Sequence, residues 1–185
     1  MKKIVSAIIF SFIMSTSCLG SVISDIDKSN IELSTRFDGT SLLVFGAISP
    51  GDDRASLLVE VLGPSTSVDI RKKVQIWGIW VNKKIAQYQG IPSFYQISIS
   101  NPKHPILKEI EYQRLKSIFY DFLEKTHISE DDNSKVLYHN ELTRLKKKLG
   151  NLSTFEEKIN VIDNKLFSYK VNLPKKIYPG IYKIK

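Results

Sequence analysis

The alternation of apolar and polar residues predicts short β-strands along most of the chain between residues 30 and 99. Asn30 to Phe37 alternates, and the strongly apolar run from Ser41 to Ile48 follows the turn signal Asp38-Gly39-Thr40. Gly and Pro residues close several such runs at intervals of about eight to twelve residues, which is typical of antiparallel sandwiches and barrels. The other strands predicted here are 56–62, 68–81, 85–89 and 94–99, with polar turns at 83–84 and 90–93.

After Asn101-Pro102 the hydrophobic period changes from two to about 3.6, which predicts two amphipathic helices forming an αα-hairpin. The first covers residues 105–125. The second begins with Ser129 as its N-cap, has acidic residues 130–132 in its first turn and lysines 146–148 in its last, and ends at Gly150. The apolar stripes are Leu107, Leu115, Ile118, Phe119 and Phe122 in the first helix, and Tyr138, Leu142, Leu145 and Leu149 in the second.

The strand pattern returns after the helices. Residues 158–162 and 166–173 flank Asp163-Asn164-Lys165, whose residue types suit a tight hairpin turn, and a last strand is predicted at 181–185. We therefore expect a mainly β fold, an immunoglobulin-like antiparallel sandwich with the αα-hairpin inserted at about residues 105–150. About 165 residues, 21–185, suffice for a single domain with its own core.

The first twenty residues have the three parts of a secretory signal peptide. Lys2 and Lys3 form a positive start, and Ile4 to Met14 is an apolar run. A run of about eleven residues is too short for a membrane span, which needs about twenty, but suits a signal peptide. With Cys18-Leu19-Gly20 as the cleavage site, the sequence predicts a signal peptide over residues 1–20. The mature protein is then exported to the periplasm or to the periplasmic face of the inner membrane.

The only cysteine of the chain offers an alternative to simple cleavage. Cys18 could be acylated as in bacterial lipoproteins, although Ser15 stands where that signal usually has leucine. In both cases residues 21–185 contain no cysteine, so no disulfide can stabilise the domain. Stability must then come from the core alone.

The chain is basic, and the excess charge is concentrated near its C-terminus. The formal net charge of +8 falls to +6 when Lys2 and Lys3 leave with the signal peptide, and residues 158–185 hold seven lysines against the single acid Asp163. Lysine predominates over arginine, whereas nucleic-acid readers favour arginine, so we expect no nucleic-acid partner. The basic C-terminal segment is interpreted as solvated surface, with peripheral contact to anionic lipid or to an acidic partner as the alternative.

Residue patterns for catalysis or metal binding are scarce. The histidines, His104, His127 and His139, lack metal-ligand spacing, and the sequence has neither a G-x-S-x-G elbow nor a glycine-rich phosphate loop. The acidic clusters suit a turn and a helix start better than a calcium loop. We therefore predict no catalytic, cofactor-binding or metal-binding residues and a protein that is not an enzyme. An enzyme with an unfamiliar site is the remaining alternative.

Aromatic and basic residues gather between Val68 and Tyr95. Two tryptophans three positions apart point to opposite faces of a regular strand unless Gly78 marks a bulge, so one of them is expected in the core. Three interpretations stay open: both indoles pack inside the sandwich, they form a surface recognition patch, or they lie at a membrane interface. The predicted partner-binding patch consists of Arg71, Lys72, Lys73, Trp77, Trp80, Asn82, Phe94 and Tyr95.

An ordered set of segments resembles a known family. The segments are IELSTRFDGTSLLVFGAI (31–48), VLGP (61–64), RKK (71–73), GIWVN (78–82), PSFY (92–95), LP (173–174) and PGIY (179–182). In this order they are similar to an alphaproteobacterial family whose members are called "putative transmembrane proteins". The resemblance implies a signal peptide, an extracytoplasmic domain and one C-terminal membrane helix. Its genes often lie beside permeases similar to sulfite exporters, which implies an inner-membrane permease as partner, and it implies no catalytic residues.

The sequence departs from the family pattern at its C-terminus. It ends at Lys185, where the family would complete its last strand and enter the membrane helix, so a truncated chain or a lost anchor is expected. We expect a non-enzymatic periplasmic or envelope module that binds or assists an inner-membrane transport protein. The alternative is a stand-alone soluble periplasmic protein with a binding or chaperone-like role.

Overall fold

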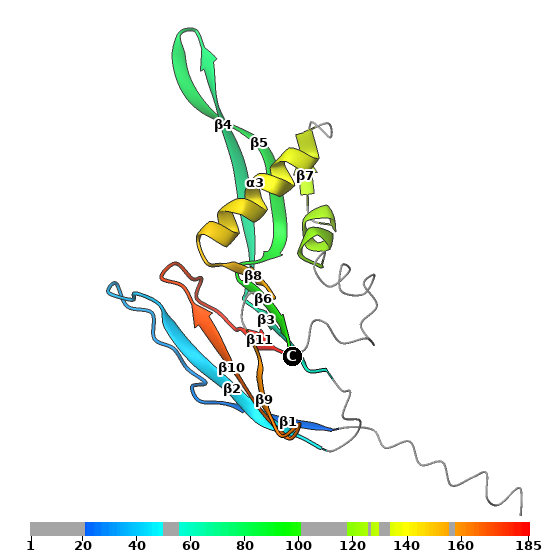
Figure 1. Ribbon diagram of the computed structural model, residues 1–185. Coiled ribbons are helices and arrows are strands. Elements are labelled where there is room, and N and C mark those ends of the chain that lie inside the picture. Colours follow the sequence, from blue (N-terminus) through cyan, green and yellow to red (C-terminus); the bar gives the residue numbers. More distant parts are fainter. Residues whose placement is uncertain (1–20, 50–55, 101–117, 126, 130–133, 156–157) are drawn as a thin grey trace, which may run out of the picture.

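The computed structural model describes residues 21–49, 56–100, 118–125, 127–129, 134–155 and 158–185. This part of the chain is mainly β, with antiparallel sheets, as the sequence predicts. Its strands are β1 (Val22–Ile26), β2 (Thr40–Ile48), β3 (Leu58–Leu62), β4 (Ser65–Ile76), β5 (Ile79–Pro92), β6 (Tyr95–Ile99), β7 (His127–Ser129), β8 (Leu152–Thr154), β9 (Asn160–Ile162), β10 (Leu166–Leu173) and β11 (Lys183–Ile184). Its helical segments are 118–125 and α3 (Lys135–Lys148) (Figure 1).

Two four-stranded sheets enclose the first core. Sheet A has the order β1-β2-β10-β9, and sheet B has the order β11-β3-β6-β8. Alternate side chains of β2 and β10 point toward sheet B, because the register places Leu42 opposite Val171 and Val44 opposite Tyr169. The buried residues of this core are Leu42, Val44, Val59, Val61, Phe94, Ile159, Phe167, Tyr169, Val171 and Leu173. Burying such side chains is the main stabilising contribution to a fold.

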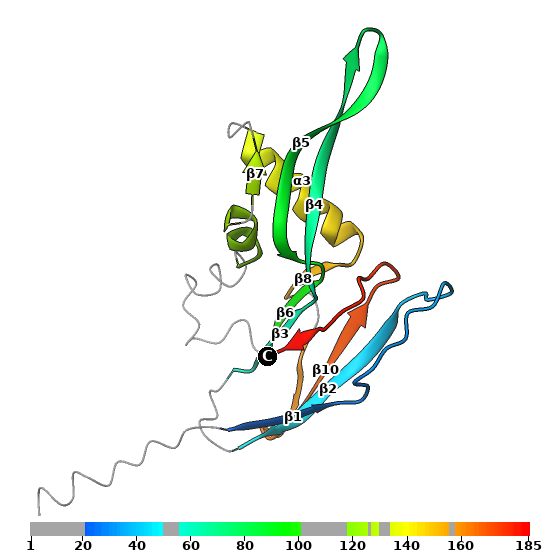
Figure 2. The same ribbon diagram turned by 180° about the vertical axis from the view of Figure 1, so that it is seen from behind.

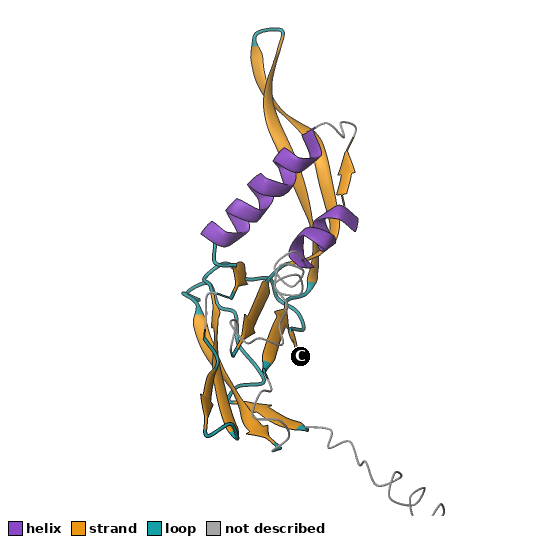
Figure 3. Cartoon of the chain, turned by 45° about the vertical axis from the view of Figure 1, so that its right-hand side comes forward, coloured by secondary structure: helices purple, strands orange, loops and turns teal. Residues whose placement is uncertain are grey.

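A second core lies between the helices, β6 and a long hairpin. The hairpin strands β4 and β5 form sheet C together with β7. Both helices lie beside the lower half of the hairpin, and its upper half extends past them at the end of the molecule opposite sheet A (Figures 2 and 3). The buried residues of this core are Tyr88, Ile91, Tyr95, Ile97, Phe119, Leu123, Leu142 and Leu152.

Several predicted elements are confirmed. β10 has the predicted bounds, and β2 begins one residue before the predicted run. Asp163 and Asn164 both have φ of +50°, as the central residues of a type I′ hairpin turn require. Gly150 ends α3 with φ of +74°, and its N–H and that of Asn151 donate to the carbonyls of residues 147 and 146. This is the Schellman arrangement at a helix C-terminus.

Two strand predictions are wrong. Residues 30–37 form no strand, because both edges of β2 are already occupied by β1 and β10. Residues 83–84 and 90–92 are not turns but belong to β5, which runs from Ile79 to Pro92. The turn lies at Trp77-Gly78 and divides the predicted strand 68–81 between β4 and β5.

The second helix begins later than predicted and buries a different face. Ser129 lies in β7, which pairs with β5, so a strand separates the two helices and the simple αα-hairpin is wrong. Ser134 is the N-cap, and Leu145 and Leu149 are exposed. The buried positions are His139, Leu142 and Lys146, because the helix lies across β5 and the start of β6. The predicted signal peptide, Leu107, Leu115 and residues 130–132 lie outside the described residues.

Lys146 fastens α3 to the corner between β5 and β6. Its Nζ donates hydrogen bonds to the carbonyl oxygens of Pro92 at 2.9 Å and Ser93 at 3.0 Å, and lies 5.9 Å from the ring centre of Phe119. Burial lowers the pKa of Lys146 to about 8. A neutral amine keeps two N–H groups, so both hydrogen bonds can survive deprotonation.

We predict that Lys146 makes the free energy of unfolding rise between pH 8 and pH 10. The pKa of this amine is near 10.5 in the unfolded chain, so the unfolded chain binds more protons in this window and stability increases with pH. The gain should be about 2 kcal/mol, and Lys146→Met should lack it. Urea unfolding of both proteins at pH 8 and pH 10 measures how much of the pH dependence comes from Lys146. Ionisation of the tyrosines affects both proteins equally and therefore cancels in the comparison. An equal pH dependence in both would contradict this role of Lys146.

Candidate functional site: an exposed hairpin arm

The upper half of the β4–β5 hairpin contributes to neither core. We name residues Arg71–Lys84 the hairpin arm. All of its residues are exposed except Val74, which is half-buried. The lower half of the same hairpin supplies Tyr88 to the second core, with Val68 and Ile70 packed against it. The arm is therefore a two-stranded projection beyond the helices (Figures 1 and 3).

A two-residue turn closes the arm. Trp77 has φ of +52° and Gly78 has φ of +80°, and Ile76 pairs with Ile79 on either side. These are the features of a type I′ turn. Gln75 Nε2 donates to the carbonyl oxygen of Gly78 at 3.4 Å. A Cβ atom added to Gly78 would meet nothing within 4 Å, so the turn stands clear of the rest of the chain.

Apolar side chains cover the end of the arm. Trp77 is 97% exposed, Ile79 67% and Trp80 65%, and Ile76 and Val81 are also exposed. The expectation that one tryptophan lies in the core is wrong, because the turn carries both indoles past the last core residues. For the same reason neither packs inside the sandwich.

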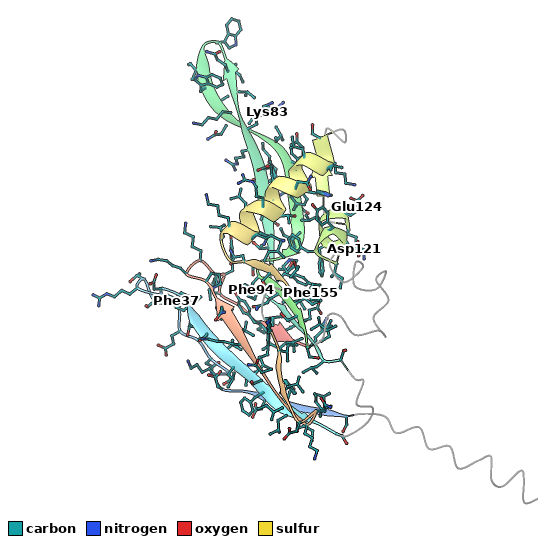
Figure 4. The ribbon with its side chains drawn as sticks, in the orientation of Figure 1. Phe37, Lys83, Phe94, Asp121, Glu124 and Phe155 are labelled. Atoms are coloured by element: carbon teal, nitrogen blue, oxygen red, sulfur yellow. The ribbon has the colours of Figure 1, made fainter. Side chains whose placement is uncertain are left out.

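Basic residues lie directly behind the apolar end. Arg71 is opposite Lys84 and Lys72 is opposite Lys83. Figure 4 shows Lys83 on the arm above α3. The Asp69 carboxylate lies 2.9 Å from Lys84 Nζ and accepts a hydrogen bond from Arg71 Nη2 at 3.3 Å. The hydrogen bond from Lys84 holds the pKa of Asp69 below its ordinary value. Among the described residues, no carboxylate pairs with Lys72 or Lys83.

The arm brings together six of the eight residues of the predicted patch, Arg71, Lys72, Lys73, Trp77, Trp80 and Asn82. Phe94 and Tyr95 do not join them, which corrects the prediction. They are 2% and 0% exposed and belong to the first and second cores, because the chain between β5 and β6 is covered on both sides. Tyr95 also donates a hydrogen bond to Glu60 Oε1 at 3.2 Å.

Sequence reasoning missed the aliphatic part of the arm. Ile76 and Ile79 form one cross-strand pair, and Val74 and Val81 form the next on the same face. The signal for them was present, because KKVQI before Trp77-Gly78 is nearly mirrored by IWVNKK after it. A mirrored order of residue types about a two-residue turn is the pattern of a hairpin whose paired positions match.

Sheet A carries a second exposed apolar surface on its outer face. The register aligns one apolar residue from each strand in a single row, Ile23, Ala47, Leu166 and Ile162. Ile23 is 75% exposed, Ile162 59% and Leu166 54%. This row lies at the end of the molecule away from the arm, and it serves below as a comparison for the arm (Figures 1 and 2).

The histidines of the described residues do not form a reactive constellation. His139 is buried, with its ring 5.6 Å from that of Tyr88 and its Nδ1 3.9 Å from Glu124 Oε2, so it packs α3 onto the hairpin. His127 lies in β7, and His104 is outside the described residues. No group of three or more His, Cys, Asp or Glu in the described ranges could hold a metal ion. The same ranges contain no helix with the length and apolar character needed to span a membrane.

We predict that intrinsic tryptophan fluorescence reports only on the arm. The chain has two tryptophans, both in the arm and both exposed. The native protein should therefore emit like indole in water, be quenched strongly by acrylamide, and change little on unfolding in urea. Far-ultraviolet circular dichroism should show the unfolding transition that the fluorescence lacks. A blue-shifted native emission that moves to longer wavelength on unfolding would contradict the exposed arm.

Comparison with known families gives one match. Residues 21–185, which include every described residue, match the family described as "Putative transmembrane protein (Alph_Pro_TM)". No curated protein matches the chain. No solved structure matches it. The match covers both cores and the arm, and on this extent the chain belongs to the Alph_Pro_TM family.

Proposed function

We propose that this protein is a non-enzymatic, exported envelope module that works at the periplasmic face of the inner membrane and binds or assists a membrane-embedded transport protein. The hairpin arm carries this proposal. It projects from the body, it contributes to neither core, and Trp77 stands 97% exposed at its end. Tryptophan and arginine are the residue types most enriched among binding hot spots.

Two further observations support the location. The family is described as a transmembrane one, and its match begins at Ser21, the residue that follows the predicted cleavage site. The resemblance of the sequence to relatives encoded beside permeases favours a transport protein as the partner. We also retain, as an interpretation, an immunoglobulin-like type for the sandwich of sheets A and B, a scaffold that often presents binding loops at its ends.

A stand-alone soluble module with a binding or chaperone-like role is the second candidate. The apolar row on the outer face of sheet A favours it, because such a surface could hold an extended or unfolded chain. In that case the row at Ile23 and Ile162 would be the contact surface, and the arm would be dispensable. The two candidates therefore differ in which end of the molecule meets the partner.

In-cell photo-crosslinking distinguishes these ends. A photoreactive amino acid placed at Trp77 should yield a crosslinked inner-membrane permease after membrane solubilisation in mild detergent. The same amino acid at Ile162, which is also exposed, is the matched control and should yield no such product. If crosslinked products form only from position 162, and all of them are soluble proteins, the result would favour the stand-alone module. Absence of any membrane-protein product from Trp77 would contradict the proposed function.

A further inference from the structure

The residue at the tip of the arm opposes the preference of its own turn. Type I′ turns place both central residues at positive φ, for which Asn, Asp and Gly are suited. The β9–β10 hairpin of this chain follows that preference with Asp163 and Asn164. Trp77 adopts the same conformation with a large side chain that makes it unfavourable. Because the indole is 97% exposed, no contact within the described chain offsets that cost.

The basic pair behind the tip is also unfavourable for the isolated hairpin. Lys72 lies directly opposite Lys83, and like charges in that position destabilise an antiparallel pair. Asp69 approaches Arg71 and Lys84 instead, one pair nearer the body. The backbone strain at Trp77 is a pointer to function. An anionic surface outside the chain would offset the repulsion between Lys72 and Lys83.

Apolar and basic residues are ordered along the arm. Pairs two positions apart share a face, so Ile76–Ile79, Val74–Val81 and Lys72–Lys83 follow one another down one side. At about 3.4 Å per residue, the apolar end from Val74 to Trp77 is about 10 Å long. Interfacial amphipathic helices bury their apolar face about 5–10 Å into the boundary between headgroups and acyl chains, a depth that the apolar end of the arm matches. The lysine pair then lies at the level of the lipid phosphates.

We infer that the tip of the arm inserts into the headgroup layer of an anionic lipid membrane, with both indoles at the acyl boundary and Lys72, Lys73 and Lys83 beside the phosphates. The inference rests on the proposed function for its membrane location, and it names lipid as the surface that the tip enters. Tryptophan is enriched at this depth in membrane proteins, and lysines near an anionic surface are attracted to it.

The backbone sets a limit to the depth of insertion. Among the described residues, β4 and β5 pair only with each other within the arm, so the outward N–H and C=O groups of both strands need water. Open strand edges do not enter the hydrocarbon region. The arm therefore stops in the hydrated headgroup layer and does not cross the membrane.

The distribution of side chains around the arm favours lipid over a protein surface. Ile79 and Trp80 are adjacent in β5 and so point to opposite faces, and Trp77 stands at the end. A flat protein surface would cover only one of these directions. A fluid headgroup layer contacts all of these directions and still leaves the tip beside a permease in the same membrane. With the tip in that layer, sheet A at the other end of the molecule lies away from the membrane (Figure 1).

Vesicle binding tests this inference. We expect the protein to sediment with vesicles made of equal parts phosphatidylglycerol and phosphatidylcholine, with a blue shift of its tryptophan emission. Binding to phosphatidylcholine vesicles should be much weaker. Binding to the anionic vesicles should decline as salt rises from about 0.1 M to about 1 M, because the screening length falls from about 10 Å to about 3 Å. Equal binding to both vesicle types would overturn the inference.

Two variants separate binding from folding. Trp77→Asn places a residue suited to the turn at the tip, so its stability should equal or exceed that of the native protein. Its affinity for the anionic vesicles should nevertheless fall about tenfold or more. Lys72→Gln combined with Lys83→Gln should weaken binding about 25-fold, about fivefold for each lysine. Unchanged affinity in either stably folded variant would overturn the inference.

Matched controls remove the same kinds of group elsewhere. Ile23→Ser with Ile162→Ser removes two exposed apolar residues from sheet A, and Lys165→Gln with Lys176→Gln removes two exposed lysines from the basic C-terminal segment. Both should bind the anionic vesicles with nearly native affinity. If the variant with both C-terminal substitutions loses as much affinity for the anionic vesicles as the variant with both arm lysines replaced, the C-terminal segment is the lipid contact and the inference is overturned.

The vesicles contain no protein, so this test and the crosslinking test fail separately. Vesicle binding through the arm without a crosslinked permease would support the lipid contact and contradict the proposed partner. A permease crosslinked from Trp77 without vesicle binding would place the tip in a protein pocket. That result would overturn the lipid contact and leave the proposed function standing.

Discussion

Strand β6 is buried on both faces, and the rest of the fold depends on that arrangement. All five of its residues, Tyr95–Ile99, are buried. Because successive side chains alternate, Tyr95 and Ile97 enter the core under the helices while Ser98 faces sheet A and shares a 2.8 Å hydrogen bond with the Tyr169 hydroxyl. One strand thus joins the sandwich to the helical half. The hydrogen bonds of Lys146 to the corner just before β6 fix α3 to the same place.

The hairpin arm is the part of sheet C that this arrangement leaves outside. Buried positions on the hairpin end at Ile70 and its partner Ala86, and no core dictates which side chains are used in the arm beyond them. The arm nevertheless has a tryptophan in a left-handed conformation and two lysines opposite each other. Both choices lower the stability of the hairpin. Both become favourable when the arm meets an anionic, partly apolar surface, because the free energy of binding then offsets the lower stability of the free protein.

Hydrophobic periodicity predicted the strands that have one face in a core, since burial on one face imposes alternation. It predicts β2 and β10 for this reason, and the residue types at Asp163-Asn164 predict the turn between β9 and β10. Periodicity does not reveal that the side chains on both faces of the arm are exposed to water. It also took Lys83-Lys84 for a turn, although that pair lies within a strand. The mirrored order of residues about Trp77-Gly78 was the better guide.

Burial of polar residues was the other obstacle to prediction. The sequence places Lys146 in the last helical turn, where its charge suits the helix dipole. In the structure the carbonyl groups of Pro92 and Ser93 accept its hydrogen bonds inside the protein. Phe94 and Tyr95 follow the arm closely in sequence, yet the corner after Pro92 takes them into the two cores. Such placements depend on contacts between distant segments, which local patterns of residues do not encode.

We propose that the hairpin arm serves binding and not folding. The most direct measurement replaces residues 72–83 with Asn-Gly, which closes a type I′ turn between the paired residues Arg71 and Lys84. The shortened protein should keep its free energy of unfolding to within about 1 kcal/mol and move from the membrane fraction of the cell to the soluble fraction. A loss of several kcal/mol in the free energy of unfolding, or continued recovery with the membrane, would contradict this role of the arm.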